Sequence, residues 1–137
     1  MGALRRKIVE MVQTFNIRTV SIFASISSLS GGNQQKVVIG RALSTGPQVV
    51  LLDDPTRGVD VGAKAEVHHI LNRLTAQGCG VILVSSELPE VLAMSDRVIV
   101  MYRGQVRAVL TQAEIDHEIV MGLATGADAV ATSPLPA

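Results

Sequence analysis

The sequence feature that most constrains this chain is the segment Leu-Ser-Gly-Gly-Asn-Gln-Gln-Lys at residues 29–36. Two glycines stand directly before an amphipathic run, so a flexible loop brings its backbone N–H groups to the start of a helix. The N-terminus of a helix attracts anions, because its first N–H groups have no acceptor within the helix and the helix dipole is positive there. Residues 29–36 therefore predict an anion-binding loop.

A second segment, Val-Val-Leu-Leu-Asp-Asp-Pro at residues 49–55, joins an apolar run to two carboxylates. The run is too short for a stable lone helix and rich in branched residues, so we predict a strand that is buried on both faces. Side chains alternate along a strand, and Asp53 and Asp54 are therefore expected to have separate roles. Carboxylate oxygens are ligands that magnesium prefers. A phosphate-binding loop and an acidic strand end together indicate nucleotide chemistry.

These segments resemble the motifs of ABC-type ATPases. Residues 29–36 look like the signature motif, residues 49–55 like the Walker B strand, and Thr-Arg-Gly-Val-Asp-Val-Gly at residues 56–62 like the D-loop, in the same order and at similar spacing. The residues within these motifs resemble those of the second ATPase module of bacterial monosaccharide importers of the ribose type. The match covers only the C-terminal half of such a module, from about residue 8 to residue 126. It implies an α/β fold, a partial P-loop NTPase with mostly parallel strands and flanking helices, without the Walker A strand.

The resemblance assigns nucleotide contacts to the loop at residues 29–36. In such modules the hydroxyl of Ser30 and the N–H groups of Gly31 and Gly32 would contact the terminal phosphate of ATP bound to an opposing module. The alternative is that Ser30 and the glycines form only a helix cap and a turn, which the agreement over eight residues makes less favourable. The implied nucleotide-contacting residues are Ser30, Gly31, Gly32, Asn33, Gln34 and Asp60.

The same resemblance assigns catalytic roles to three further residues. Asp53 matches the residue that holds magnesium, usually through water, and Asp54 the general base that orients the attacking water. Ser86 follows the apolar run at residues 81–84 and matches the switch position. The family normally has Glu in place of Asp54 and His in place of Ser86, so the module's own ATP site is expected to be slow or silent. Without the resemblance, the carboxylates would be cap or turn residues and Ser86 the N-cap of a helix over residues 87–94.

The remaining elements follow from the spacing of apolar residues. Helices are predicted at residues 4–15, 32–44 and 63–77, the second burying Val38, Ile39, Ala42 and Leu43 and the third turning Glu66 to solvent. A strand at residues 98–101 leads into a hairpin with residues 105–110. Thr111 is expected to cap a last helix whose core face is Ile115, Ile119, Val120 and Leu123. Residues 1–126 are expected to form one partial ABC ATPase domain and residues 127–137 a disordered tail.

Composition limits the partners and the compartment. Twelve basic residues balance twelve acidic ones, which disfavours binding to nucleic acid. The single cysteine cannot form an internal disulfide, and no stretch is apolar over a bilayer's thickness. We therefore expect a cytoplasmic protein, peripheral on the inner face of the cell membrane when assembled.

No Gly-Lys pair followed by Ser or Thr occurs in the sequence, so the Walker A loop is absent. The chain alone is therefore expected neither to bind nor to hydrolyse ATP, and the cofactors ATP and Mg²⁺ belong to a complete assembly. In the family's sheet, the strand before Walker A lies between those matching residues 81–84 and 98–101. Its absence predicts exposed strand edges, and hence local rearrangement or a homodimer.

Three functions compete. The first is a fragment of the ATP-binding subunit of an ABC sugar importer, whose partners would be another ATPase module and membrane permease subunits. The second is a non-catalytic interaction module that pairs with a separately encoded ATPase half. The third is a chromosome-maintenance or repair ATPase, which shares the Ser-Gly-Gly and Walker B motifs but requires DNA contacts that a neutral chain does not favour.

Overall fold

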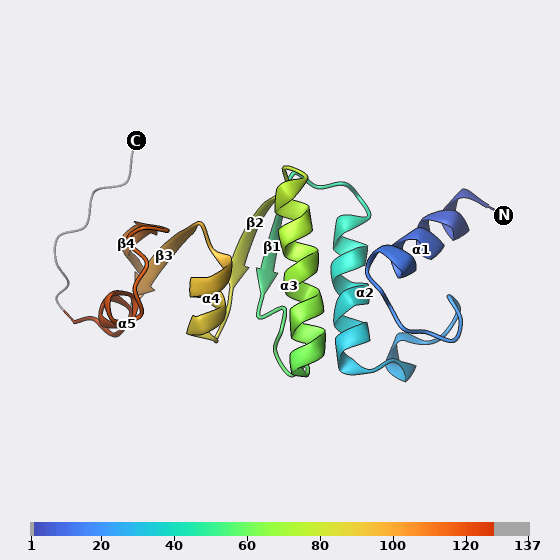
Figure 1. The fold of residues 1–137 in the computed structure, drawn as a ribbon, viewed down its shortest axis with the longest axis horizontal. Helices are drawn as coiled ribbons and strands as arrows, with labels where there is room; N and C mark the ends of the chain where they lie inside the picture. The colour runs from blue at the N-terminus through green and yellow to red at the C-terminus, as the bar shows by residue number, and fades with distance from the viewer. Residues whose placement is uncertain (1, 128–137) are drawn as a thin grey trace. The chain divides into compact units, whose positions relative to one another are not determined.

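The computed structural model describes residues 2–127 of the chain. These residues divide into two compact units, the first ending at Val84 and the second beginning at Ser85. Figure 1 shows the helices and strands of each unit.

The first unit is built from three α-helices, one short 3₁₀ helix and a pair of parallel strands. Helix α1 (Ala3–Thr14) is followed by the short 3₁₀ helix η1 (Ile26–Ser28), then α2 (Gly31–Leu43), β1 (Val49–Asp53), α3 (Val61–Ala76) and β2 (Gly80–Val84). Strands β1 and β2 pair in parallel, with Val49 opposite Gly80 and Asp53 opposite Val84. Helix α3 connects them, so β1, α3 and β2 form a β-α-β unit, the arrangement expected for an α/β fold.

The apolar residues of the first unit gather between the helices and one face of this sheet. Its buried core consists of Phe15, Ile17, Ile39, Val50, Val67, Ile70 and Leu71. In Figure 1, α3 lies along the strands and α2 lies beside α3. Val67, in the middle of α3, is fully buried. The predicted positions of α1, α2 and α3 are confirmed to within about two residues at each end.

The prediction that the strands are buried on both faces is wrong. Val49 and Leu51 in β1 are 59% and 69% exposed, and Ile82 and Val84 in β2 are 54% and 51% exposed. These four residues share one face, because Leu51 pairs with Ile82 in the parallel register. Within the first unit, helix α3 packs against the opposite face, so this face has no cover there. The predicted burial of Val38 and Ala42 in α2 is also wrong, since both are exposed.

The second unit contains helix α4 (Leu88–Met94), an antiparallel hairpin of β3 (Arg97–Tyr102) and β4 (Gln105–Thr111), and helix α5 (His117–Thr125). Arg103 and Gly104 both have positive φ at the hairpin turn, as a two-residue type I′ connection requires. One face of the hairpin packs against α5. The core there consists of Val98, Val100, Ala108, Leu110, Val120 and Leu123. The predicted hairpin is confirmed.

Two predicted helix caps in the second unit are wrong. Asp116, and not Thr111, caps α5, because its carboxylate accepts the N–H groups of Glu118 and Ile119. Thr111 instead donates its hydroxyl and its backbone N–H to Glu114, and these two bonds lower the pKa of that carboxyl. Ile119, predicted to face the core, is 46% exposed. The other is the cap of α4, where Glu87 and not Ser86 occupies the N-cap position.

Two further observations concern the ends of the chain and the membrane. Apart from Ala127, the predicted tail at residues 127–137 lies outside the described residues. Among residues 2–127, no helix combines the length and the apolar character that crossing a bilayer needs.

Candidate functional site

The loop predicted to bind an anion leads directly into helix α2, which begins at Gly31 with Ser30 at the N-cap position. The first intrahelical bond runs from Gln34 N–H to the Ser30 carbonyl, at 2.9 Å. The N–H groups of Gly31 and Gly32 come before this bond and so belong to the helix end that attracts anions. Ser30 is exposed, and its side chain makes no capping bond to the helix backbone. The Ser30 hydroxyl and the first N–H groups of α2 are therefore not used by capping bonds from the Ser30 side chain.

The side-chain amides of Asn33 and Gln34 hold this loop in place. Asn33 Nδ2 donates to Ser30 Oγ at 2.8 Å, and Asn33 Oδ1 accepts the backbone N–H of Arg18 at 2.8 Å. Gln34 Nε2 donates to the Leu29 carbonyl, also at 2.8 Å. Both side chains are half-buried. Asn33 and Gln34 thus act within the chain in this structure, where the sequence predicted contacts to nucleotide.

The loop at residues 29–36 that resembles the signature motif, called the signature loop from here on, and the start of helix α3 lie side by side. A Cβ on Gly32 would stand 2.5 Å from the Ala63 Cβ, so these two helix ends touch where Gly32 has no side chain. The carbonyl oxygen of Gly58 lies 4.0 Å from the corresponding position on Gly31. Asp60 is the N-cap of α3, and its carboxylate accepts the Ala63 N–H at 2.9 Å. The structure thus brings Ser30, Gly31 and Gly32 together with the predicted D-loop.

An ion pair between a buried lysine of α2 and a half-buried glutamate of α3 was not predicted from the sequence. Lys36 in α2 is only 2% exposed, and its Nζ donates to Glu66 Oε2 in α3 at 2.5 Å and to the Asn16 carbonyl at 2.6 Å. Asn16 Nδ2 also donates to the second oxygen of Glu66, at 3.4 Å. The bond from Lys36 lowers the pKa of the Glu66 carboxyl. Glu66, predicted to face solvent, is instead half-buried against α2, which corrects that prediction.

The two carboxylates that end β1 differ in environment. Asp53 is exposed at the last position of the strand. Asp54 is half-buried, and its backbone N–H donates to the Val84 carbonyl at 2.8 Å, which extends the pairing with β2 by one residue. Its φ of 45° is left-handed, a conformation in which Asp occurs more often than most residues. Arg57 lies 3.9 Å from the Asp54 carboxylate and is 80% exposed, so that pair contributes little to stability.

Ser86 belongs to the second unit, where it is exposed just after β2. The prediction that it could cap the following helix is wrong, because α4 begins at Leu88 with Glu87 at the N-cap position. Ser85 organises this turn instead. Its Oγ accepts the Glu87 N–H at 3.0 Å and donates to the buried carboxylate of Glu90. No sequence pattern separates the role of Ser85 from that of Ser86, since the two serines are adjacent.

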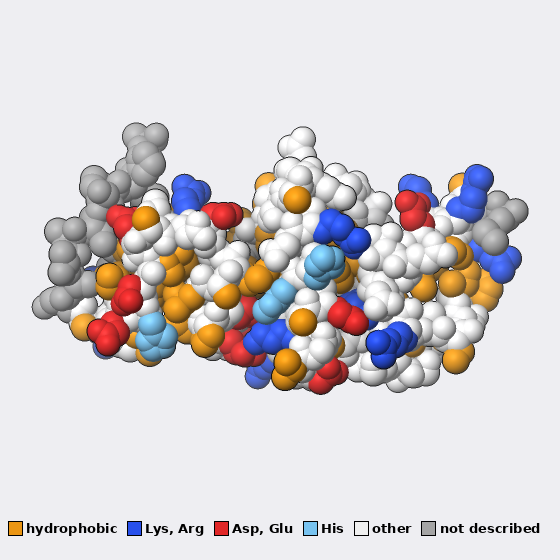
Figure 2. Space-filling view, viewed as in Figure 1, with side chains coloured by type: hydrophobic (Ala, Val, Ile, Leu, Met, Phe, Trp, Pro, Cys, Tyr) orange, Lys and Arg blue, Asp and Glu red, His pale blue; other side chains and the backbone are white. Residues whose placement is uncertain are grey.

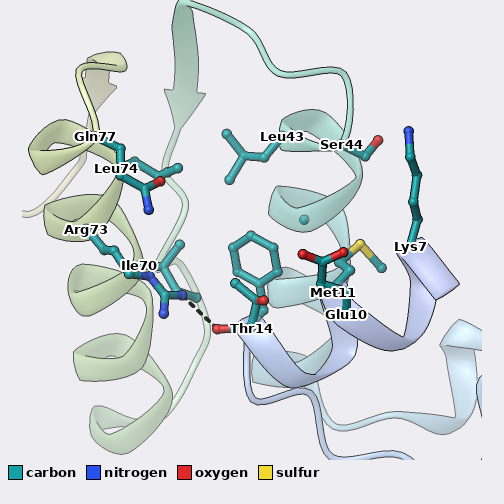
Figure 3. Close-up of a pocket in the computed structure, with 12 residues that line it drawn as sticks. Lys7, Glu10, Met11, Thr14, Leu43, Ser44, Ile70, Arg73, Leu74 and Gln77 are labelled. Atoms are coloured by element: carbon teal, nitrogen blue, oxygen red, sulfur yellow. Dashed lines mark hydrogen bonds between the residues drawn. The ribbon is translucent and has the colours of Figure 1, made fainter.

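An open cavity of about 390 Å³ lies between α1, α2 and α3, and Figure 3 shows the side chains around it. Apolar side chains such as Met11 and Leu43 line the cavity together with the charged side chains of Lys7 and Glu10. The Arg73 guanidinium spans from α3 to the Thr14 carbonyl at 2.7 Å. The lining residues that α2 and α3 contribute come from their C-terminal halves, so this cavity is distinct from the loop at residues 29–36, which precedes the N-terminus of α2.

The donors in the first unit suit a phosphate better than a metal bound by protein alone. A hydroxyl and two N–H groups at the start of α2 are the groups that contact phosphate oxygens. Asp53 offers a carboxylate of the kind that holds magnesium. Over residues 2–127, however, no group of three or more His, Cys, Asp or Glu residues is placed to hold a metal ion. A magnesium ion on Asp53 would therefore need further ligands from phosphate and water.

Comparison with known proteins decides the family. A family model described as ABC transporter matches residues 3–57, a segment that includes α1, the signature loop, α2 and β1. Residues 3–57 contain part of an ABC transporter domain. The resemblance that the motifs indicated is thereby confirmed.

Two curated relatives of this ABC transporter domain are ribose importers by name. Ribose import ATP-binding protein RbsA 1 of Rubrobacter xylanophilus is 54% identical over 124 residues, which make up 90% of this chain and 25% of that protein. Ribose import ATP-binding protein RbsA of Bacillus cereus is 53% identical over 119 residues, which are 87% of this chain and 24% of that protein. The chain thus spans about a quarter of the length of the curated relatives that it matches.

Solved structures of ATP-binding cassettes share the fold of this ABC transporter domain. The cassette MJ1267 of an ABC transporter superposes with a TM-score of 0.77 at 25% identity, over 93% of this chain and 50% of that one. The dimeric structure of MJ0796, a bacterial ABC transporter cassette, gives a TM-score of 0.71 at 26% identity, over 82% and 49%. The predicted fold class, a partial P-loop NTPase, is confirmed.

Proposed function

We propose that this chain is part of the ATP-binding subunit of an ABC sugar importer and that it supplies its signature loop to ATP bound on another module. The observation that carries the proposal is the helix end at Ser30, Gly31 and Gly32, where an exposed hydroxyl and two backbone N–H groups precede the first intrahelical bond of α2. The names of the relatives, which are ribose import proteins, support a sugar as the transported substrate. The other module, permease subunits and a position on the inner face of the cell membrane complete the proposed assembly.

The proposal gives each remaining site residue a role. Asp53 would hold magnesium through water, and Asp54 and Ser86 would stand in the places of the general base and the switch residue. Asp60 fixes the start of α3 beside the signature loop and so sets where that loop lies. The cofactors ATP and Mg²⁺ would be bound by the complete assembly.

A complementation experiment tests this function. The Bacillus cereus relative is produced without its matched 119-residue segment and is combined with this chain, and ATP turnover is measured for each part and for the pair. We expect the pair to release phosphate faster than the sum of its parts. Ser30→Ala in this chain should lower the restored turnover about 100-fold, because it removes a donor to the transferring phosphate. Wild-type chain that restores no turnover would contradict the proposed function.

The 137-residue chain alone is expected to release no phosphate from ATP above a buffer control. It contains no Gly-Lys pair followed by Ser or Thr, and hence no loop that cradles the α- and β-phosphates. Malachite-green assay of the purified chain with magnesium and ATP measures this. Turnover by the chain alone that disappears in Asp53→Ala would show that the chain carries a complete site.

We also propose that the uncovered sheet face of the first unit promotes self-association. Val49, Leu51, Ile82 and Val84 together form an apolar patch of the kind that marks interaction surfaces. Sedimentation analysis over increasing concentration should show a dimer that Leu51→Lys weakens about tenfold or more, because the charge would be buried. Val20→Lys, at an exposed apolar side chain outside the sheet, is the matched control. If Leu51→Lys and Val20→Lys have the same dimer dissociation constant, the sheet face is not the surface through which the chain self-associates.

The two alternative functions have less support. A non-catalytic interaction module that lends only its helices to a separately encoded ATPase would not need the donors at Ser30, and Ser30→Ala would then leave the complementation assay unchanged. A DNA-dependent ATPase would need a basic surface. In the face that Figure 2 shows, basic and acidic side chains are interspersed and do not gather into a region of one charge.

A further inference from the structure

Two hydrogen bonds fix the orientation of the Asn33 amide and the direction of its bond to Ser30. The backbone N–H of Arg18 can only donate, so the Asn33 atom that lies 2.8 Å from it must be the carbonyl oxygen Oδ1. The amide nitrogen Nδ2 is therefore turned toward Ser30. Since Nδ2 can also only donate, Ser30 Oγ is the acceptor in the 2.8 Å bond between them.

This direction leaves the hydroxyl hydrogen of Ser30 unused. Ser30 Oγ accepts one bond from Asn33 and makes no capping bond to α2. Among residues 2–127 the hydroxyl hydrogen of Ser30 has no acceptor, and the side chain is exposed. A hydroxyl that accepts one hydrogen bond becomes a better donor in the next, because the two bonds polarise each other. The hydroxyl therefore presents a donor to an acceptor outside the chain.

We infer that Asn33 is a positioning residue for Ser30: it ties the signature loop to the backbone at Arg18 and directs the Ser30 hydroxyl proton outward, to a phosphate oxygen. The inference rests on the proposed function for its ligand, a nucleotide phosphate on another module. It assigns Asn33 an indirect role, acting through Ser30, in place of a contact of its own with the nucleotide. Two properties of Asn33 can be tested separately. The first, the clamp, is the bond that Asn33 Oδ1 accepts from the Arg18 N–H. The second, the polarity, is the direction of the bond from Asn33 Nδ2 to Ser30 Oγ, which leaves the Ser30 hydroxyl free to donate.

The clamp is tested on the 137-residue chain without any ligand. Amide hydrogen exchange of Arg18, followed by NMR, should be about five- to tenfold faster in Asn33→Ala than in the wild type, because the N–H loses its acceptor. Asn33→Asp keeps a carbonyl-like oxygen at this place and should leave the exchange rate within about twofold of the wild-type rate. Unchanged exchange in Asn33→Ala would overturn the clamp, whatever the outcome of the complementation experiment.

The polarity is tested by the same aspartate variant in the complementation assay. A carboxylate in place of the amide can only accept hydrogen bonds. It would therefore accept one from the Ser30 hydroxyl, which would then point away from the phosphate. Asn33→Asp should therefore lower the restored turnover at least about 30-fold while Arg18 stays protected. A role in folding alone would not separate these two measurements.

A double-mutant cycle separates loss of the Ser30 proton from simple charge repulsion. If Asn33 acts through Ser30, adding Asn33→Asp to Ser30→Ala should change turnover by less than about threefold. If the new charge merely repels phosphate, the full loss should persist in the Ser30→Ala background and would overturn the inference. Failure of wild-type chain to complement would instead reject the proposed function, and the Arg18 exchange rate would still decide whether Asn33 clamps the loop.

Discussion

Replacing Lys36 with methionine is expected to lower the free energy of unfolding of this chain by about 2–3 kcal/mol. The Lys36 side chain is 3% exposed and donates to both the Glu66 carboxylate and the Asn16 carbonyl. Methionine would fill most of the space but would leave the carbonyl and the carboxylate without their shared donor. Because Glu66 is 35% exposed, water can solvate part of the lost interaction, which sets the value below that of a fully buried pair. Urea unfolding at neutral pH measures the change.

A matched control and a pH series identify the cause. Lys7→Met makes the same chemical change at an exposed lysine of α1 and should stay within about 0.5 kcal/mol of the wild type. The pKa of Glu66 is lowered by Lys36 below its ordinary value of 4.5, so the pair contributes fully above that value and less as pH falls through the lowered pKa. The difference between wild type and Lys36→Met should therefore narrow in acid. A difference independent of pH would show that packing, and not the ion pair, was lost.

The sequence was sufficient to place the signature loop but not to show what holds it. Two glycines followed by a 3.6-residue period predict where α2 begins, because that pattern depends only on neighbouring residues. The contacts of Asn33 with Arg18 and of Lys36 with Glu66 join segments 15 and 30 residues apart. No local pattern contains such pairs. A lysine near the middle of an amphipathic helix is ordinarily exposed, and its burial here depends on an acceptor in another helix.

Strand burial also depends on contacts between distant segments, which a local sequence pattern does not contain. The run at residues 49–52 predicted a strand, and β1 confirms it, yet Val49 and Leu51 are exposed. Apolar residues in succession indicate that both faces of a strand are suited to burial, whereas the cover itself comes from other segments. In the first unit α3 covers one face only. The helix caps failed for a related reason: Thr111 and Asp116 are both good N-cap residues, and the start of α5 decides between them.

The two adjacent glycines of the signature loop are expected to respond in opposite ways to alanine, which separates packing from helix propensity. A Cβ on Gly31 would meet nothing closer than 4.0 Å, so Gly31→Ala should leave the free energy of unfolding unchanged or raise it by up to about 1 kcal/mol, since alanine favours a helix. A Cβ on Gly32 would stand 2.5 Å from the Ala63 Cβ, a distance that α2 and α3 can relieve only by moving apart. Gly32→Ala should therefore lower the free energy of unfolding by about 1–3 kcal/mol despite its better helix propensity.

A compensating substitution shows whether the contact between α2 and α3 causes that loss. Ala63→Gly removes the methyl group that the new Cβ would strike, so the double variant Gly32→Ala with Ala63→Gly should recover most of the stability, less about 1 kcal/mol for a glycine in α3. Thermal unfolding of the four proteins gives the coupling between the two positions. Additive losses would mean that α2 and α3 do not touch at these residues. Recovery would establish that position 32 requires glycine because α2 contacts the start of α3 directly there. This contact places Ser30 beside the loop that contains Asp60.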